Sequence, residues 1–320
     1  MADMKPTRDG FGEALLELGA SDPRVVALSG DLEDSSRAKW FKDQYPDRFF
    51  SVGIAEQDLI GTAAGLAIAG KIPFACSFSA FVSGKSWEQI RIAVCYQNVN
   101  VKIVGSHGGL SVGADGATAE ALEEFAILRV LPHMTVIVPC DANEAKQATF
   151  AAHKHVGPVY LRLGRAPVPT ITPPDAPFVI GKAARLRDGD DATIIACGTL
   201  VAHALQAAES LQKESINVRV VNMATIKPLD AEAIRDAARD TGAIVTAEEH
   251  SVVGGLGGAV AEIVAQQYPV PMRCVGVQDR FGTSGDPADL FKVFHLMPED
   301  VIKATKDVLR LKQERVGFTR

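Results

Sequence analysis

Short runs of β-branched and apolar residues alternate with helix-like stretches along nearly the whole chain, and this alternation most constrains its fold. In the first half, strands are expected at Val25–Leu28, Ile72–Ser77, Val99–Val104, Thr135–Val138 and Val159–Leu163. In the second half, they are expected at Thr193–Cys197, Val218–Val221, Ala243–Ala247 and Arg273–Val277. Strands that alternate with helices are typical of an α/β protein with open, mostly parallel sheets.

A proline-rich segment interrupts this alternation. Five prolines occur between Ala166 and Pro177. Proline fixes φ and offers no N–H group, so neither a helix nor a central strand is expected there. A chain of 320 residues has the length of about two domains. We therefore predict a first domain at residues 1–166, a linker at 167–180 and a second domain at 181–320.

Composition excludes several classes of protein. Hydrophobic residues make up 47% and charged residues 22% of the chain, which is typical of a globular protein and not of a disordered one. A net charge of -6, with both signs spread along the sequence, offers no basic surface to nucleic acid or to an anionic membrane. We find no leader peptide and no apolar run that could cross a bilayer, and expect a cytoplasmic protein. The scattered cysteines and histidines predict free thiols and no metal site.

One glutamate lies among apolar neighbours near the start of a predicted helix. Glu56 ends a segment of small and apolar residues and precedes the helix expected at Leu59–Ala69. Partial desolvation of a carboxyl group favours its protonated form and suits it to share a proton with a ring nitrogen. The alternative is a glutamate that only complements the dipole of the helix.

Two further segments are candidates for ligand contacts. Phe78 and Phe81 follow an expected strand; in a helix their rings would face one side, where a flat ring could stack. A phenylalanine pair at this spacing is more commonly part of a core. The glycine-rich stretch Gly105–Thr118 predicts a loop at the ligand edge of a sheet, although it lacks the phosphate-loop patterns.

Together, the order and spacing of these segments resemble transketolase. In the first half, the resemblance lies in Gly53–Gln57, Phe78–Phe81, Gly105–Gly116 and Pro139–Glu144. In the second half, it lies in Ile226–Asp230, Glu248–His250 and Gly254–Gly257. The resemblance implies a pyrimidine-type thiamine-diphosphate domain, followed by a domain like the transketolase carboxy-terminal domain.

The resemblance also implies a cofactor site. Glu56 stands where the family has the glutamate that hydrogen-bonds to N1′ of the aminopyrimidine of thiamine diphosphate. Phe81 matches the aromatic residue that stacks on this ring, with Phe78 beside it. Asp31 matches an aspartate near the cofactor.

A site for sugar phosphates is implied in the same way. Arg8, Ser35, His107 and Arg165 match the anion site of the family, and Asp115 matches the aspartate that contacts the donor hydroxyl next to the ketone. Arginine suits a phosphate because its planar donors match the oxygens. Taken singly, each of these residues is typical of a solvated surface.

Two positions depart from the family pattern. Many relatives read Asp-Gly-Pro-Thr-His where this chain reads Asp-Gly-Ala-Thr-Ala, so Ala119 offers no imidazole to a substrate hydroxyl. Gly84 replaces a bulkier residue near the pyrimidine. Ala119 therefore bears on the efficiency of the ketol step and on the identity of the donor sugar.

The diphosphate site of the family is missing from the sequence. Thiamine-diphosphate enzymes hold the diphosphate through Mg²⁺ or Ca²⁺, using Gly-Asp-Gly and a later asparagine. Gly-Asp-Gly occurs nowhere in the sequence, and the nearest strings, Arg187–Asp190 and Gly285–Pro287, predict turns. We therefore expect a separate partner subunit that holds the diphosphate and the cation, in a heterotetramer with two copies of each chain.

The expected function is that of a transferase subunit that moves a two-carbon ketol unit from a ketose phosphate to an aldose phosphate. Three alternatives stay open: a related enzyme for a sulfonated or branched sugar, a β-type subunit of a 2-oxoacid dehydrogenase, and a non-catalytic scaffold. Ala119 favours the first, the anion set disfavours the second and Glu56 disfavours the third.

Overall fold

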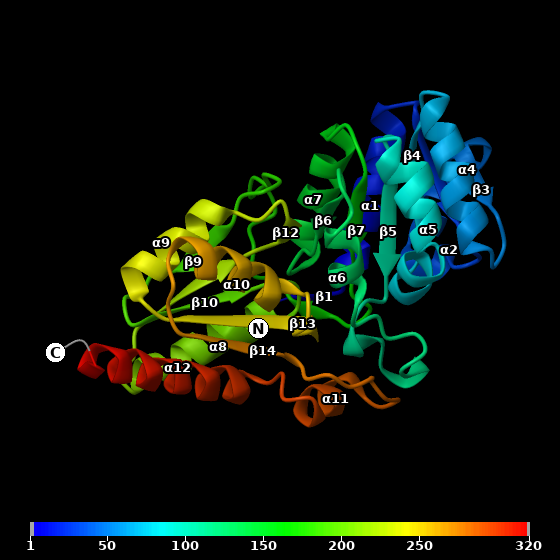
Figure 1. Cartoon of the computed structure of the whole chain (residues 1–320). Coiled ribbons are helices and arrows are strands. Elements are labelled where there is room, and N and C mark those ends of the chain that lie inside the picture. The colour runs from blue at the N-terminus through cyan, green and yellow to red at the C-terminus, as the bar shows by residue number, and fades with distance from the viewer. Residues whose placement is uncertain (1–2, 319–320) are drawn as a thin grey trace.

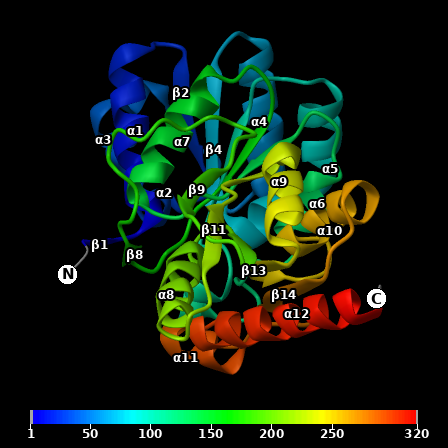
Figure 2. The same ribbon diagram turned by 90° about the vertical axis from the view of Figure 1, so that its left-hand side faces the viewer.

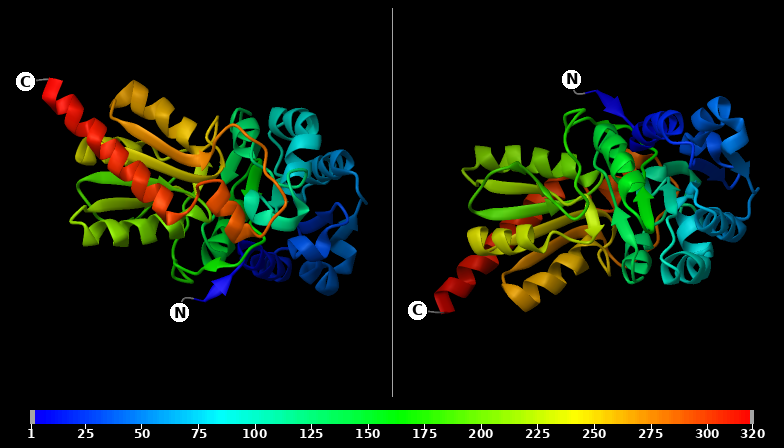
Figure 3. Two further views of the ribbon diagram at one scale, coloured as in Figure 1. Left: turned by 90° about the horizontal axis from the view of Figure 1, so that it is seen from below. Right: turned by 90° about the horizontal axis from the view of Figure 1, so that it is seen from above.

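The computed structural model of the chain describes residues 3–318, which form two α/β lobes (Figure 1). Both lobes are open, mostly parallel sheets with helices on their two faces, so the predicted fold class is confirmed. Figure 3 shows the lobes side by side, the blue-to-green amino-terminal lobe and the green-to-red carboxy-terminal lobe. None of the helices in residues 3–318 is both long and apolar enough to span a bilayer.

The amino-terminal lobe contains, within the described residues, a sheet of seven strands. In spatial order these are β12 (Thr225–Lys227), β6 (Thr135–Ile137), β7 (Val159–Arg162), β5 (Lys102–Ser106), β4 (Ile72–Phe78), β2 (Val25–Ser29) and β3 (Phe49–Ser51). All neighbours pair in parallel except β12, which is antiparallel to β6 and comes from the second half of the chain. Sequence reasoning missed β12, because no local pattern encodes a pairing between lobes.

Burial on both faces of this sheet follows from the side-chain alternation along its strands. In β2, Val25 and Ala27 face one core cluster, whereas Val26 and Leu28 face the other. The first face carries α1 (Thr7–Ser21), α3 (Ala38–Gln44) and α7 (Ala142–Lys154). The second carries α4 (Glu56–Ile68), the π-helix η3 (Ile90–Tyr96) and α6 (Glu124–Arg129).

Shorter elements connect these layers. They are α2 (Glu33–Ser36), η1 (Pro46–Arg48), the π-helix η2 (Phe81–Lys85), α5 (Trp87–Gln89), η4 (Leu110–Asp115) and the paired strands β1 (Met4–Lys5) and β8 (Val168–Pro169). Beyond β8 the proline-rich segment is irregular, and the amides of Ile171 and Thr172 donate to the Asp141 carboxylate at 2.8 and 2.7 Å. The segment is therefore tied to the amino-terminal lobe.

The carboxy-terminal lobe is smaller. Its sheet has the order β14 (Met272–Val277), β13 (Ile244–Ser251), β10 (Ala192–Ala196), β11 (Val218–Asn222) and β9 (Ala184–Arg187), with β9 as the antiparallel edge. One face is covered by α8 (Leu200–Lys213) and α12 (Pro298–Phe318), the other by α9 (Ala231–Thr241) and α10 (Leu256–Gln267). Figure 2 shows α12 crossing this lobe, with α11 (Pro287–Val293) beside its start.

Candidate active site

The residues predicted for the site come mainly from the carboxyl ends of parallel strands in the amino-terminal lobe. Asp31 follows β2, Phe78 ends β4 and His107 follows β5. Arg165 lies three residues beyond the end of β7. The carboxyl edge of an open parallel sheet is the usual place for ligands, and the predicted loop at Gly105–Thr118 lies there.

Glu56 is the first residue of α4 and is only 1% exposed. Within the described residues, its carboxylate has one hydrogen-bond partner, the Lys85 ammonium group, with Nζ 2.5 Å from Oε2. Lys85 ends the π-helix η2, and its side chain is 53% exposed. Sequence reasoning missed this lysine because it lies 29 residues away, and a π-helical turn has no simple sequence signature.

Three aromatic side chains form a continuous stack beside this carboxylate's helix. The Phe78 and Phe81 ring centroids are 5.9 Å apart, and the planes are inclined by 23°. Phe78 also stacks on the His107 ring at 4.0 Å and 21°. The two phenylalanines thus lie together as expected, although Phe78 ends a strand and only Phe81 is helical.

His107 is buried, with 3% exposure, and its backbone has a φ of 58°. Burial, with a smaller contribution from nearby Arg8 and Arg165, lowers the pKa of His107 to about 3. The ring is therefore neutral: Nε2 accepts from Arg8 Nη1 at 3.4 Å, and Nδ1 donates to Ser106 Oγ at 2.8 Å. In this state His107 orients Arg8 and adds no positive charge of its own.

Arg8 and Arg165, the two arginines predicted to bind an anion, both line a single cavity of 650 Å³. Arg8 reaches it from α1 and donates through Nη1 to the Ser35 carbonyl at 2.9 Å, which brings Ser35 to the site through its backbone. Arg165 lines the same cavity. Arg37, which the sequence did not single out, also lines it and pairs with Asp9 at 2.7 Å. Burial, followed by repulsion from Arg37, lowers the pKa of Arg8.

Asp115 comes to the same region through Arg165. Its carboxylate Oδ1 lies 3.5 Å from Arg165 Nη1, which also donates to the Val112 carbonyl at 2.7 Å. Asp31 is exposed and has a φ of 63°, and among the described residues no hydrogen bond joins its side chain to the other predicted ones. Ala119 is 5% exposed, so the loop buries a methyl group at the position that departs from the family pattern.

A buried charge cluster fixes the loop after β5 to the carboxy-terminal lobe. Glu249 accepts from the Ser111 amide at 2.6 Å and from Thr199 Oγ1 at 2.9 Å. Arg162, which is 4% exposed, donates to the Glu249 carbonyl at 2.9 Å and lies 3.0 Å from a Glu124 carboxylate oxygen. Burial raises the pKa of Glu124 to about 7, more than Arg162 lowers it. The cluster therefore couples the loop after β5 to both lobes.

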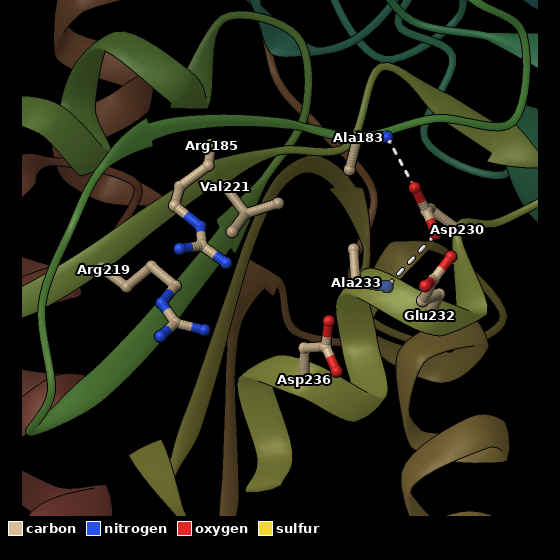
Figure 4. Close-up of a pocket in the computed structure, with 8 residues that line it drawn as sticks. All are labelled: Ala183, Arg185, Arg219, Val221, Asp230, Glu232, Ala233 and Asp236. Carbon is tan, nitrogen blue, oxygen red and sulfur yellow. Dashed lines mark hydrogen bonds between the residues drawn. The ribbon is translucent and has the colours of Figure 1, made fainter. Parts of the chain in front are cut away.

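A separate hollow of 200 Å³ lies in the carboxy-terminal lobe, between β9, β11 and α9 (Figure 4). Arg185 and Arg219 lie on one side of it, and Asp230 and Asp236 on the other. Asp230 accepts from the amides of Ala183 and Ala233, each at 3.1 Å, and thereby caps α9. None of the residues predicted for the site lines this hollow.

The donor set beside β4 and α4 fits the aminopyrimidine end of thiamine diphosphate. Glu56 offers a buried carboxylate to a ring nitrogen, and Phe81 offers an aromatic face. Beside Gly84 there is open space, since no atom lies within 4 Å of an added Cβ. Within residues 3–318, no group of three or more His, Cys, Asp or Glu side chains is placed to hold a metal ion. The chain therefore offers groups for the pyrimidine.

The fold and this donor set define a pyrimidine-binding thiamine-diphosphate module joined to a second α/β domain. Residues 3–170 match the family described as "Transketolase, pyrimidine binding domain", and residues 181–301 match "Transketolase, C-terminal domain". The chain belongs to the transketolase family.

Several relatives match over nearly their whole length. The chain is 43% identical to a putative transketolase C-terminal section of Methanocaldococcus jannaschii, over 96% of this chain and 97% of that protein. It is 44% identical to the 6-deoxy-6-sulfo-D-fructose transketolase subunit SqwH of a Clostridium species, over 96% of both chains. It spans about half of longer relatives, such as the human transketolase, with 36% identity over 97% of this chain and 50% of that protein.

A solved structure described as "Split gene transketolase, inactive beta4 tetramer" has the same fold. The TM-score is 0.91 at 46% identity, and the match covers 96% of this chain and 99% of that one. The recognition of a transketolase-type chain with the two carboxy-terminal domains of the family is thereby confirmed.

Proposed function

We propose that the chain is the pyrimidine-binding subunit of a split transketolase that transfers a two-carbon ketol unit from a ketose phosphate to an aldose phosphate. The observation that carries this proposal is the meeting of Arg8 and Arg165 at one cavity, connected through His107 and Phe78 to Phe81. In this proposal, the phosphate grip and the pyrimidine platform belong to one continuous site.

Each residue has a role in this proposal. Thiamine diphosphate, when bound, supplies the carbanion chemistry that breaks and forms a carbon–carbon bond next to a ketone. Glu56 holds a proton at ring atom N1′, and Phe81 orients the ring by stacking, with Phe78 and Asp31 alongside.

The same proposal gives the anion set its task. Arg8 and Arg165 bind the anionic end of the sugar, with Ser35 and His107 holding Arg8 in place. Asp115 accepts a hydrogen bond from the hydroxyl next to the ketone. No metal ligand is assigned to this chain.

We also propose that a separate partner subunit completes the enzyme. It holds the diphosphate and Mg²⁺ or Ca²⁺, and two copies of each chain form a heterotetramer with sites between unlike subunits. Support comes from relatives whose names call them subunits or sections, and from the solved relative described as inactive in its beta4 form.

A sulfonated or branched sugar is the second candidate substrate. Two relatives are named for such sugars: the sulfofructose transketolase chain, and a chain of the apulose-4-phosphate transketolase of Phocaeicola vulgatus, 41% identical over 96% of this chain and 99% of that protein. The buried Ala119 favours a donor that needs no imidazole at that position. Both a sulfonate and a phosphate suit the arginines that line the cavity.

Reconstitution tests the proposal. The chain is mixed with a subunit that contains Gly-Asp-Gly, thiamine diphosphate and Mg²⁺, and transfer from xylulose 5-phosphate to ribose 5-phosphate is measured. We expect turnover by the pair and none by either chain alone. Glu56→Gln should lower kcat by about 10²–10⁴-fold, the usual contribution of a positioned acid or base. Glu209→Gln, at an exposed position of α8, is the control.

Two outcomes contradict the proposal. Turnover by this chain alone would overturn the need for a partner, and full activity of Glu56→Gln would overturn its role at the ring nitrogen. The ratio of kcat/KM values for phosphorylated, sulfonated and branched ketoses then decides between the candidate substrates.

A further inference from the structure

The two members of the Glu56–Lys85 ion pair differ sharply in burial. The carboxylate is almost fully enclosed, whereas the lysine side chain is half exposed. Within residues 3–318, the Lys85 ammonium group is the one hydrogen-bond donor to the Glu56 carboxylate. A buried carboxylate needs a counter-charge, because water cannot solvate it. Lys85 is thus what stabilises ionised Glu56 in the chain as it stands.

The segment that carries Lys85 can move the lysine away from Glu56 with a small loss of free energy. Residues Phe81–Lys85 form a π-helix, a form that is rare and frequently lies at functional sites. Gly84, directly before the lysine, has open space beside it. The Lys85 carbonyl accepts an exposed hydrogen bond from Gln57 Nε2 of α4, at 3.2 Å. Withdrawal of the lysine therefore requires no repacking of buried apolar side chains.

This inference rests on the proposed function. We propose that Lys85 is a positioning residue that occupies the Glu56 carboxylate until thiamine diphosphate binds, and that N1′ of the aminopyrimidine then replaces its ammonium group. The two groups compete because both require the same carboxylate, and Lys85 uses Oε2. The lysine thus prevents an unpaired buried charge in the free subunit and sets a threshold for cofactor binding.

The exchange has a proton balance that can be measured. Paired with Lys85, Glu56 is a carboxylate, and the lysine leaves as an ammonium group with its own proton. To share a proton with the ring nitrogen, the carboxyl group takes one up from solvent. Cofactor binding should therefore consume about one proton per site near neutral pH, and the affinity should fall as pH rises.

The first arm of the test uses the chain alone, without cofactor. Lys85→Met, Glu56→Gln and the double variant are compared with the parent by thermal unfolding at pH 7.5. We expect Lys85→Met to lower Tm by about 2–6 °C, and the double variant to recover part of this loss, because Gln has no charge to bury. Lys71→Met, at an exposed position, is the control. If the Tm changes of the two single variants simply add in the double variant, Glu56 and Lys85 do not interact, and the proposal is wrong.

The second arm uses the reconstituted complex with Mg²⁺ and thiamine diphosphate, titrated calorimetrically in two buffers of different ionisation enthalpy. The parent should take up about one proton per site, Lys85→Arg the same, and Lys85→Met less than about a third of a proton, with roughly 3–10-fold tighter binding. Weaker binding by Lys85→Met, or unchanged proton uptake, would overturn the competition. A parent complex that binds no thiamine diphosphate would instead overturn the proposed function.

Discussion

Two buried carboxylates of this chain, Glu56 and Glu249, have opposite surroundings. Among the residues that the structure describes, Glu56 has one partner, the half-exposed Lys85 at the end of a π-helical turn. Glu249 accepts from the Ser111 amide and the Thr199 hydroxyl, and Arg162 lies against it, fully inside the protein.

The difference lies in the partners and not in burial, since each carboxylate residue is 1% exposed. A carboxylate with several rigid, buried donors stabilises the fold and cannot bind a ligand without losing those donors. One whose single partner reaches in from solvent can exchange that partner for a ligand. The exposure of the partner is therefore the feature that separates the candidate functional carboxylate from the structural one.

The sharpest way to break the comparison is to remove Arg162. Arg162→Met leaves Glu124 and Glu249 buried without their cation, so we expect the free energy of unfolding to fall by about 3–5 kcal/mol. Urea denaturation measures this loss. Arg185→Met, at a half-exposed position on β9, should change stability by less than about 1 kcal/mol. Similar losses in both variants would show that the cluster is not structural.

Arg165, like Lys85, is a half-exposed cation with a carboxylate partner. Its Nη1 lies 3.5 Å from Asp115 Oδ1, a long distance for an ion pair. Arg165→Met should raise KM for anionic sugars about 10–150-fold, because one charge-assisted contact contributes roughly 1.5–3 kcal/mol. KM for an uncharged ketose should change little. Steady-state kinetics of the reconstituted enzyme test this, and equal losses for both substrates would exclude an anion site at Arg165.

A third buried carboxyl group, Glu120, predicts how the stability of the chain depends on pH. Burial and the nearby Glu249 carboxylate raise the pKa of Glu120 to about 7. The folded chain therefore keeps a proton that the unfolded chain loses near pH 4.3, and stability falls as pH rises from about 5 to 7. Glu120 contributes about 1 kcal/mol per pH unit to this slope, and Glu124, whose pKa is also raised to about 7, adds to it with the same sign. Glu120→Gln should therefore reduce the slope of the Tm profile over this range; an unchanged slope would contradict the assignment.

The smallest effect is expected at Thr199. Thr199→Val removes one of the donors to Glu249 and keeps the shape of the side chain. We expect a loss of about 0.5–1.5 kcal/mol and faster amide exchange at Ser111, whose N–H donates to the same carboxylate. Thr170→Val, which lies outside this cluster, serves as the control. Unaltered exchange at Ser111 would show that Glu249 does not depend on Thr199.

Sequence reasoning recovered the parallel strands of both sheets except the short edge strand β3, because β-branched runs and their flanking turns are local signals. The strand expected at Val99–Val104 begins only at Lys102, since strand ends depend on pairing with neighbours. Glu56 stood out through its apolar flanks. Arg8 and Arg165 were found only through the family resemblance, since they lie far apart in the chain.

Other features of the site depend on tertiary contacts that no local pattern encodes. The pairing of Lys85 with Glu56 requires a π-helical turn to face the start of α4. Arg37 lines the cavity while its own backbone has a φ of 67°, a conformation that sequence does not predict for arginine. Arg162 and Glu249 are 87 residues apart and meet only when the lobes pack.

Strand β12 has a consequence for how the chain is made. It supplies one edge of the amino-terminal sheet from residues 225–227, so a growing chain lacks this edge until well after the first lobe has left the ribosome. Until then β6 presents unpaired backbone groups that can template association with other nascent chains. A truncation that stops in the proline-rich segment should therefore aggregate during expression, whereas one that extends past Lys227 can close the sheet.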